Sequence, residues 1–465
     1  MRRLRYFSRA KRNFGSVKKA AAPVRVIVVS FVLLILAGAF LLTLPVSSAA
    51  GGFTHPLDAL FTATSATCVT GLSVVDTTSY WSPFGQAVVL LLIQLGGLGL
   101  STFATGFSLL VHRRLGLREM ILTGEASGGD MPDAASLLKL MLGFTFACEL
   151  LGAGLLMLRF VPEYGAAGVW PSVFVAVSAY CNAGFDILGF VPGNSSLTAF
   201  TGDPLVCLTI DALIVIGGLG FVVVRDIYQC KLLSPLRHRG RKRLNFHSQV
   251  CLRATCALLA AGTLGFLLME WGRTMEGLSF PAKLNTALFQ SVNTRTAGFA
   301  SVDIGAQGSF TKVLSVALMF IGGCPGSTAG GIKTTTLVVL LVTVGSTLRG
   351  RDESAVLRHR FAPGTVYKAM TVVLLGLTVV FADACAFTLL NPQIRFIDLL
   401  YEAASAFGTA GLSAGVTGKL EPVSRVILCL TMFIGRVGPV SFGLSIMMKA
   451  KSQPGILPEG RMLIG

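Results

Sequence analysis

Four short segments of the sequence share one pattern, and their even spacing constrains the fold more than any other feature. In each segment a glycine is preceded by Thr or Ala and followed by Leu or Phe. The glycines stand at positions 71, 184, 298 and 411, so the successive intervals are 113, 114 and 113 residues. Self-similarity at a fixed period indicates a repeated structural unit. The four tetrads are Val69-Thr70-Gly71-Leu72, Asn182-Ala183-Gly184-Phe185, Thr296-Ala297-Gly298-Phe299 and Thr409-Ala410-Gly411-Leu412.

Long apolar stretches recur along the whole chain, and the longest, Pro83–Val111, holds no charged residue. Only 13% of the residues are charged, against about a quarter in soluble domains. About 20 apolar residues suffice for a helix that crosses a bilayer. We therefore predict an all-α polytopic membrane protein. Its eight predicted spans lie near Val24–Leu44, Pro83–Val111, Leu137–Leu158, Leu205–Val224, Cys251–Met269, Val313–Leu348, Val366–Leu390 and Val426–Met447.

The basic residues orient these spans. An even number of spans places both termini on one side, and residues 1–23 carry eight Lys and Arg and no acid. When basic residues near the ends of the spans are counted with the adjoining loops, the inside segments hold 28 basic residues and the outside segments hold 8. Both termini are therefore predicted to be cytoplasmic. The N-terminus is expected to contact anionic lipids. A net charge of +17 would also suit nucleic-acid binding, but it is spread over loops, so we expect no nucleic-acid partner.

Each quarter of the chain follows one plan: a span, an outside turn with a proline, a short segment, the tetrad and a second span. The short segment cannot cross a bilayer and is predicted to be a half-helix that starts at the proline. Its C-terminal dipole end then points into the membrane and favours a cation. The predicted organisation is a basic N-terminus at 1–23, repeats at 24–113, 137–230, 250–349 and 366–450, and a cytoplasmic tail at 451–465. The proline turns are His55-Pro56, Trp170-Pro171, Phe280-Pro281 and Asn391-Pro392.

Glycines also recur in the second spans, where two interpretations stay open. They can belong to the pore, or they can permit tight helix packing of the small-xxx-small kind. The sets are Gly96-Gly97-Leu98-Gly99, Gly217-Gly218-Leu219-Gly220, Gly322-Gly323-Cys324-Pro325-Gly326 and Gly435-Arg436-Val437-Gly438-Pro439.

The tetrads suit cation conduction. A dehydrated ion needs oxygen ligands, and rings of backbone carbonyls from four loops supply them for potassium. Glycine reaches the backbone conformations that such loops require, and it adds no side chain to the path. Non-helical backbone at membrane depth is tolerated where it is buried in protein or lines an aqueous cavity. The sequence therefore predicts a selective cation pore.

The four tetrads and the segment Thr62–Leu72 resemble the Trk/Ktr/HKT superfamily of potassium transporters, most closely its Ktr-type membrane subunit. The resemblance implies four helix, pore-loop, helix repeats around a pseudo-four-fold axis, as in potassium channels. It implies K⁺ uptake across a bacterial cytoplasmic membrane, with glycine rather than serine at Gly71 favouring K⁺ over Na⁺. Whether Na⁺ is coupled or only modulates transport stays open. It further implies a homodimer and a cytosolic, nucleotide-binding RCK-type ring subunit; no organic cofactor is expected in this chain.

The family also has a gate loop that interrupts the second span of the third repeat, and residues 322–333 match it. Pro325 and five glycines in this stretch oppose a straight helix independently of the resemblance. The segment Gly326–Thr334 approaches a phosphate-binding loop, but it has one residue too many and no preceding strand. The predicted gate residues are Gly322, Gly323, Pro325, Gly326, Ser327, Thr328, Gly330, Gly331, Lys333 and Arg436.

Arg436 replaces a glycine in the fourth second-span set. An arginine at membrane depth faces an interior, a partner or water, so it either forms an electrostatic barrier below the filter or pairs with a carboxylate. The resemblance favours the barrier. The carboxylates considered for pairing are Asp211, Asp383 and Glu149, and the acids that flank the tetrads, with no role assigned, are Asp58, Asp76, Asp186, Asp303 and Glu402.

The main alternative is a sodium- or proton-coupled secondary transporter with broken helices. Such folds carry two related halves, usually inverted, whereas the loop charges here give all four copies one orientation. No catalytic triad, metal cluster or dinucleotide motif is visible in the sequence. We therefore expect no enzymatic activity.

Overall fold

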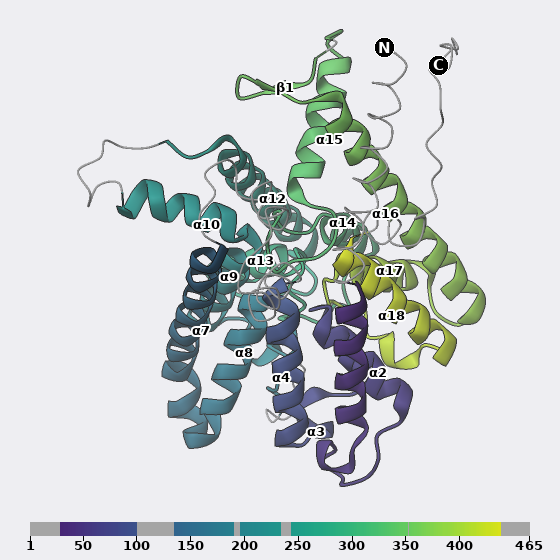
Figure 1. Cartoon of the computed structure of the whole chain (residues 1–465). Coiled ribbons are helices and arrows are strands. Elements are labelled where there is room, and N and C mark those ends of the chain that lie inside the picture. Colours follow the sequence, from purple (N-terminus) through teal and green to yellow (C-terminus); the bar gives the residue numbers. More distant parts are fainter. Residues whose placement is uncertain (1–27, 100–133, 190–195, 234–242, 352, 439–465) are drawn as a thin grey trace, which may run out of the picture.

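The computed structural model describes residues 28–99, 134–189, 196–233, 243–351 and 353–438. The predicted N-terminal segment 1–23, the tail 451–465 and Pro439 lie outside these residues. The described chain is mostly helical, with loops between the helices (Figure 1). Its one strand pair is a short antiparallel hairpin, in which β1 (Ala355–Val356) pairs with β2 (His359–Arg360).

Helices follow one another in the same order in each quarter: a first helix, a short helix before the tetrad, and a second helix after it. The short helices contain 12 to 14 residues. The bounds are Val28–Thr43, η1 (Pro45–Ser47), α2 (Pro56–Thr67), α3 (Thr77–Tyr80) and α4 (Pro83–Gly97); α7 (Ala134–Tyr164), η2 (Gly165–Gly168), α8 (Val169–Cys181), η3 (Thr198–Phe200), α9 (Pro204–Leu219), α10 (Phe221–Ile227) and η4 (Tyr228–Leu233); α12 (Phe246–Glu270), α13 (Phe280–Asn293), α14 (Ser309–Phe320) and α15 (Thr334–Thr347); α16 (Pro363–Leu390), α17 (Phe396–Gly408), η5 (Thr417–Lys419) and α18 (Pro422–Val437).

The short helices α2, α8 and α13 start at or next to the predicted prolines. Pro56 opens α2, and Pro171 and Pro281 lie in the first turns of α8 and α13. The prediction was wrong for the fourth, because α17 begins at Phe396, beyond Pro392. Asn391 instead ends the preceding helix and accepts a hydrogen bond from the Glu421 N–H at 2.9 Å. That turn is therefore fixed by an asparagine and not by the proline.

Three helical stretches of the described chain are long and apolar enough to cross a membrane: Lys139–Cys181, Phe246–Glu270 and Pro363–Leu390. A fourth is the pair Pro204–Leu219 and Phe221–Cys230, which is bent by 99°. The predicted span Val313–Leu348 is divided into α14 and α15 by residues 321–333. The spans at Pro83–Val111 and Val426–Met447 run beyond the described residues. The arrangement of eight spans therefore stays a prediction.

The bend between α9 and α10 was not predicted. Gly220, at the break, has a φ of 78°, and a Cβ placed on it would lie 2.8 Å from the Pro325 carbonyl oxygen. Only glycine fits this backbone comfortably. The predicted span Leu205–Val224 thus turns sideways near its end, and α10 runs crosswise to α9 at one side of the molecule (Figure 1).

The outer surface carries many large apolar side chains. Examples are Leu150, Leu268 and Leu389, which are 73%, 71% and 84% exposed on three different helices. Soluble monomers rarely expose contiguous apolar patches of this kind. This surface suits contact with lipid.

One buried ion pair joins the third and fourth quarters. The Lys312 ammonium on α14 donates to Asp398 Oδ1 on α17 at 2.7 Å and to the Gly305 carbonyl at 3.1 Å. The side chains of Lys312 and Asp398 are 1% and 6% exposed. Arg395 supports the carboxylate from the surface at 2.8 Å. The pair fixes the start of α17 against α14.

Replacing Lys312 by methionine is expected to destabilise the fold strongly. The substitution removes the nearest cation from the buried Asp398 carboxylate and leaves only the exposed Arg395 beside it. Breaking a buried pair outright costs about 3–5 kcal/mol, so we expect a loss toward the lower end of that range. Thermal unfolding of the detergent-solubilised protein measures the effect. Arg360→Met is the matched control, because Arg360 pairs with Glu353 on the surface, where both side chains are more than half exposed, and should leave Tm nearly unchanged. Equal Tm values for the two variants would contradict the role of the pair.

Candidate functional site

The four tetrads share an unusual backbone. The first residue of each, Val69, Asn182, Thr296 and Thr409, has a φ between 51° and 71°. The third residue is the glycine, with φ between 70° and 93°. Positive φ is uncommon for residues other than glycine, and strain of this kind clusters at functional sites. Four separate segments therefore adopt the same strained, non-helical conformation.

The tetrad glycines form a closed ring. A Cβ placed on Gly71 would lie 2.4 Å from the Ala183 carbonyl oxygen, and one on Gly184 would lie 2.4 Å from that of Ala297. The corresponding distances are 3.0 Å from Gly298 to the Ala410 carbonyl and 2.1 Å from Gly411 to that of Thr70. Each loop thus places the carbonyl of its second residue against the glycine of the loop before it. The ring closes from the fourth segment back to the first.

Side chains from the short helices hold these loops in place. The Gly71 N–H donates to Ser65 Oγ at 3.1 Å, and the Phe299 N–H donates to Asn293 Oδ1 at 3.0 Å. Glu402 is fully buried and accepts from the Ala414 N–H at 3.2 Å and the Thr417 hydroxyl at 2.9 Å. The sequence analysis missed Ser65 and Asn293. The one feature of the sequence that could have identified them is a polar side chain six or five positions before a tetrad glycine.

Glycines of the second spans pack against the ends of the short helices. A Cβ on Gly96, Gly217 or Gly435 would lie 2.0 Å from the carbonyl oxygen of Thr67, Tyr180 or Phe407, respectively. These three positions therefore serve tight packing, the second of the two interpretations left open by the sequence.

Residues 322–333, between α14 and α15, form a non-helical loop directly against the tetrads. We keep the name gate loop for these residues, without yet assigning them a function. The Thr328 hydroxyl donates to Asn182 Oδ1 at 2.8 Å, and a Cβ on Gly330 would lie 2.1 Å from Thr409 Oγ1. Its Cys324 N–H donates to the Gly218 carbonyl at 2.9 Å. A helix precedes it, so the strand of a phosphate-binding loop is missing.

The remaining predicted gate residues also belong to this loop. Gly322 and Gly323 are buried, whereas Pro325, Ser327 and Gly331 are partly exposed and Gly326 is exposed. The Gly322 N–H donates to the Ile332 carbonyl at 2.8 Å, and the Gly326 carbonyl accepts from the Phe221 N–H at 3.3 Å. These hydrogen bonds connect the two ends of the loop to each other and the loop to α10.

Arg436 lies beneath the ring and bonds to backbone carbonyls. Its guanidinium donates to the carbonyl of Thr328 in the gate loop and to that of Gly96. Among the described residues it forms no ion pair. Asp383 accepts from Thr431 and Glu149 accepts from Gln94, whereas the buried Asp211 carboxylate has no hydrogen-bond partner among the described residues. The hypothesis that Arg436 pairs with one of these three acids was wrong.

Two more cations surround the same loop. The Lys333 ammonium donates to the Ala329 carbonyl at 2.7 Å, and Arg295, which is 7% exposed, donates to the Gly322 carbonyl at 3.2 Å. Arg295 was missed because it precedes a tetrad and had no counterpart in the other repeats.

The acids that flank the tetrads have structural partners. Asp58 pairs with Arg425 at 3.1 Å, and Asp76 accepts from the Ser79 N–H at 2.9 Å. Asp186 accepts from the Ser196 hydroxyl at 2.6 Å, and Asp303 from the Gly305 N–H at 2.8 Å. None of these interactions requires a bound ion. The structure gives these acids no evident part in the site.

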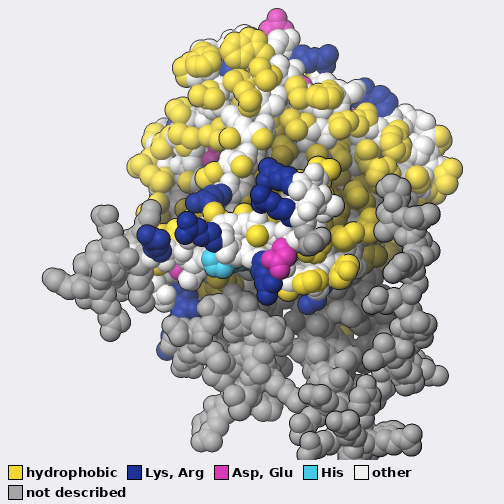
Figure 2. Space-filling view, turned by 90° about the horizontal axis from the view of Figure 1, so that it is seen from above, with side chains coloured by type: hydrophobic (Ala, Val, Ile, Leu, Met, Phe, Trp, Pro, Cys, Tyr) yellow, Lys and Arg dark blue, Asp and Glu magenta, His cyan; other side chains and the backbone are white. Residues whose placement is uncertain are grey.

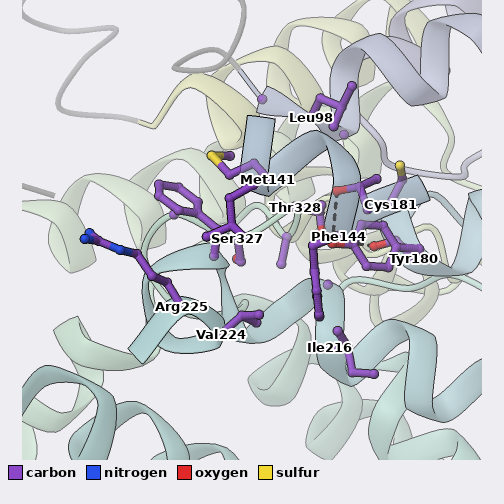
Figure 3. A pocket seen from close by; sticks show the side chains of 18 of the residues that line it. Leu98, Met141, Phe144, Tyr180, Cys181, Ile216, Val224, Arg225, Ser327 and Thr328 are labelled. Atoms are coloured by element: carbon purple, nitrogen blue, oxygen red, sulfur yellow. Dashed lines mark hydrogen bonds between the residues drawn. The ribbon is translucent and has the colours of Figure 1, made fainter. Parts of the chain in front are cut away.

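A cavity of about 540 Å³ opens beneath the gate loop. Leu98, Met141, Phe144 and Ile216 line it together with residues of α10, and Ser327 and Thr328 form its side toward the ring (Figure 3). Arg436 and Lys333 also line it.

Comparison with known proteins identifies the family of this chain. The family model described as TrkH, cation transport protein, matches residues 3–454. The chain is 38% identical to the Ktr system potassium uptake protein B of Bacillus subtilis (strain 168) over 452 residues, covering 95% of this chain and 97% of that protein.

A second relative is the potassium/sodium uptake protein NtpJ of Enterococcus hirae, 38% identical over 442 residues, 93% of this chain and 95% of that protein. The crystal structure of the potassium transporter TrkH from Vibrio parahaemolyticus has the same fold, with a TM-score of 0.70, 18% identity and coverage of 91% of this chain and 84% of that one. The chain belongs to the TrkH cation transport family, which confirms the resemblance in its sequence. It is a membrane cation transporter and not an enzyme.

Gly411→Ala is expected to distort the ring, whereas Gly415→Ala is not. Both glycines have φ near 76–79°, so alanine meets the same left-handed strain at each. At Gly411 the new Cβ would also lie 2.1 Å from the Thr70 carbonyl, while nothing lies within 4 Å at Gly415. Thermal unfolding in detergent should show a clearly larger loss of Tm for Gly411→Ala. Equal losses would mean that the glycines are not in contact across the ring.

Proposed function

We propose that this chain conducts K⁺ into the cell through a selectivity filter formed by the four tetrads. The closed ring of carbonyl and glycine contacts carries this proposal, because it brings oxygen ligands from four loops to one place. Backbone carbonyls can replace the hydration shell of K⁺. The names of its relatives as potassium uptake proteins support the choice of ion.

We propose K⁺ rather than Na⁺ as the preferred ion, with glycine at Gly71, Gly184, Gly298 and Gly411 as the reason. Selectivity depends on the number and placement of the carbonyl ligands. A side chain at any of these glycines would displace a neighbouring carbonyl. The name of the Enterococcus relative includes sodium, so Na⁺ is the second ion to test.

The architecture that we propose has eight spans in four repeats around one axis, with both termini in the cytoplasm of a bacterium. The shared element order and the tetrad backbone support the repeats. The three helices long enough to span and the bent α9–α10 pair support the membrane assignment. The basic loops support the orientation.

The gate loop and Arg436 are proposed to control flux below the filter. A cationic guanidinium beneath the ring opposes entry of a second cation. Thr328 connects both parts, since its hydroxyl donates to Asn182 and its carbonyl accepts from Arg436. Release of these bonds would free the loop to move.

Regulation is proposed to come from a cytosolic RCK-type nucleotide-binding ring that docks on a homodimer of this chain. Exposed Arg349, Arg351, Arg358 and Arg360 lie at the end of α15 and in the hairpin. Figure 2 shows Lys and Arg side chains gathered on the face seen from that end. Such a face suits an acidic partner surface.

Expression of the chain in a bacterial strain that lacks its own potassium uptake systems should restore growth at low K⁺. Gly71→Ser should lower the ratio of K⁺ to Na⁺ uptake at least tenfold, because the serine Cβ displaces the Ala183 carbonyl. Rubidium and sodium tracer uptake measure both fluxes, and Gly51→Ser, in open space, is the control. Uptake of neither ion with a cytosolic partner present would reject the pore, and strict dependence of K⁺ uptake on a Na⁺ or proton gradient would favour a coupled transporter.

Thr328→Val is expected to raise K⁺ flux severalfold. The substitution removes the hydrogen bond to Asn182 and keeps the side-chain volume, which weakens the hold on the gate loop by about 1 kcal/mol. Arg436→Ala removes both a hydrogen bond to the gate loop and the positive charge beneath the ring. It should raise K⁺ flux further or lower the selectivity for K⁺. Thr343→Val, on α15, is the control because its hydroxyl bonds only within its helix. Unchanged flux in both test variants would remove the gate loop from the mechanism.

A further inference from the structure

The cavity beneath the gate loop combines an apolar interior with a basic lining. Its described lining includes four basic side chains, Lys139, Arg225, Lys333 and Arg436, and no acidic one. Lys333 and Arg436 are engaged with backbone carbonyls at the inner end. Lys139 and Arg225 have no ion pair among the described residues. Within the described part of the chain, the cavity therefore offers two positive charges without an ion pair next to apolar walls.

These two charges lie at the mouth of the cavity. Lys139 is exposed on α7, and Arg225 on α10 extends away from the cavity centre (Figure 3). Tyr228, 40% exposed, lines the cavity next to Arg225. Because α10 turns 99° away from the spanning helix α9, it is oriented to run along the membrane surface, as interfacial amphipathic helices do. The mouth would then lie at the level of lipid headgroups.

We propose that this cavity binds an anionic phospholipid, with the phosphate at Lys139 and Arg225 and an acyl chain between Met141, Phe144, Ile216 and Val224. Basic pockets between membrane helices on the cytoplasmic side bind anionic headgroups. The volume of about 540 Å³ is in the range of about 300–1,000 Å³ that is usual for ligand pockets. The complete absence of acids from the described lining selects an anionic lipid over a zwitterionic one.

The bound chain would touch the gate loop. Ser327 and Thr328 form one side of the cavity, and Thr328 carries the bonds to Asn182 and Arg436. An acyl chain there fills the space into which the loop would move, so the lipid holds the gate loop closed. This regulatory consequence rests on the proposed pore, whereas lipid binding itself does not.

Native mass spectrometry of the full-length protein in mild detergent tests binding without any transport. Phosphatidylglycerol should bind at one site more tightly than phosphatidylcholine of the same chains, and soluble glycerol phosphate should not compete. The double variant Lys139→Gln, Arg225→Gln should weaken phosphatidylglycerol binding about 30-fold, since each basic residue contributes roughly 1 kcal/mol. Arg349→Gln with Arg351→Gln removes the same charge elsewhere and should leave this site unchanged. Equal losses in both double variants would overturn the proposal.

A second variant tests whether the apolar part of the cavity holds the acyl chain. Met141→Trp fills the cavity and should abolish the tight phosphatidylglycerol adduct, whereas Leu150→Trp, on the exposed side of the same helix, should retain it. Retained binding in Met141→Trp would show that the lipid lies elsewhere. In vesicles of phosphatidylcholine, added phosphatidylglycerol should lower K⁺ flux through the wild type and not through Met141→Trp. If the wild type binds the lipid but neither the wild type nor Met141→Trp conducts K⁺, the proposed pore is rejected and the proposed lipid site is retained.

Discussion

The structure depends on one constraint: four stretches of non-helical backbone must be accommodated inside a membrane protein. Backbone N–H and C=O groups at that depth require partners, because lipid supplies none. Ser65 and Asn293 supply some of them from the short helices. The loops also pack against one another, and each carbonyl lies against the glycine of the loop before it. No single tetrad would be stable in this conformation alone, so the four segments must assemble together.

The close packing around the ring follows from that requirement. The short helices must end at the same level, and the second helices must approach their ends without a gap. Gly96, Gly217 and Gly435 permit this approach, with no space for a Cβ at any of them. The buried Lys312–Asp398 pair then fixes the start of α17 relative to α14. Glycines thus bring the helices together near the ring, and charges fix them farther away.

Much of this could be predicted from the sequence because it repeats. The period of the tetrad glycines, the half-helices before them and the break at Pro325 each left a signal in residue type and spacing. The bend at Gly220 also had such a signal, because the fourth residue of its glycine set recurs as Gly99 and Gly438, and both have a positive φ, of 83° and 92°; the sequence was nevertheless interpreted as a straight span. Asn293 and Arg295 were missed because each occurs in one repeat. The start of α17 was wrongly predicted at Pro392 because Asn391, and not the proline, fixes that turn. Repetition identifies what the four quarters share and conceals what only one contains.

Those unshared residues gather at one place. Arg436 from the fourth quarter, Arg295 and Lys333 from the third and Asn182 from the second all contact the gate loop or the carbonyls beside it. In the proposed pore, carbonyls that accept from these cations would not be free to coordinate a passing ion, and three positive charges would oppose its arrival. A ring of four similar loops would have no preferred direction in which to open. In this proposal the differences between the quarters supply that direction, because they hold one loop from one side and leave the cavity on the other.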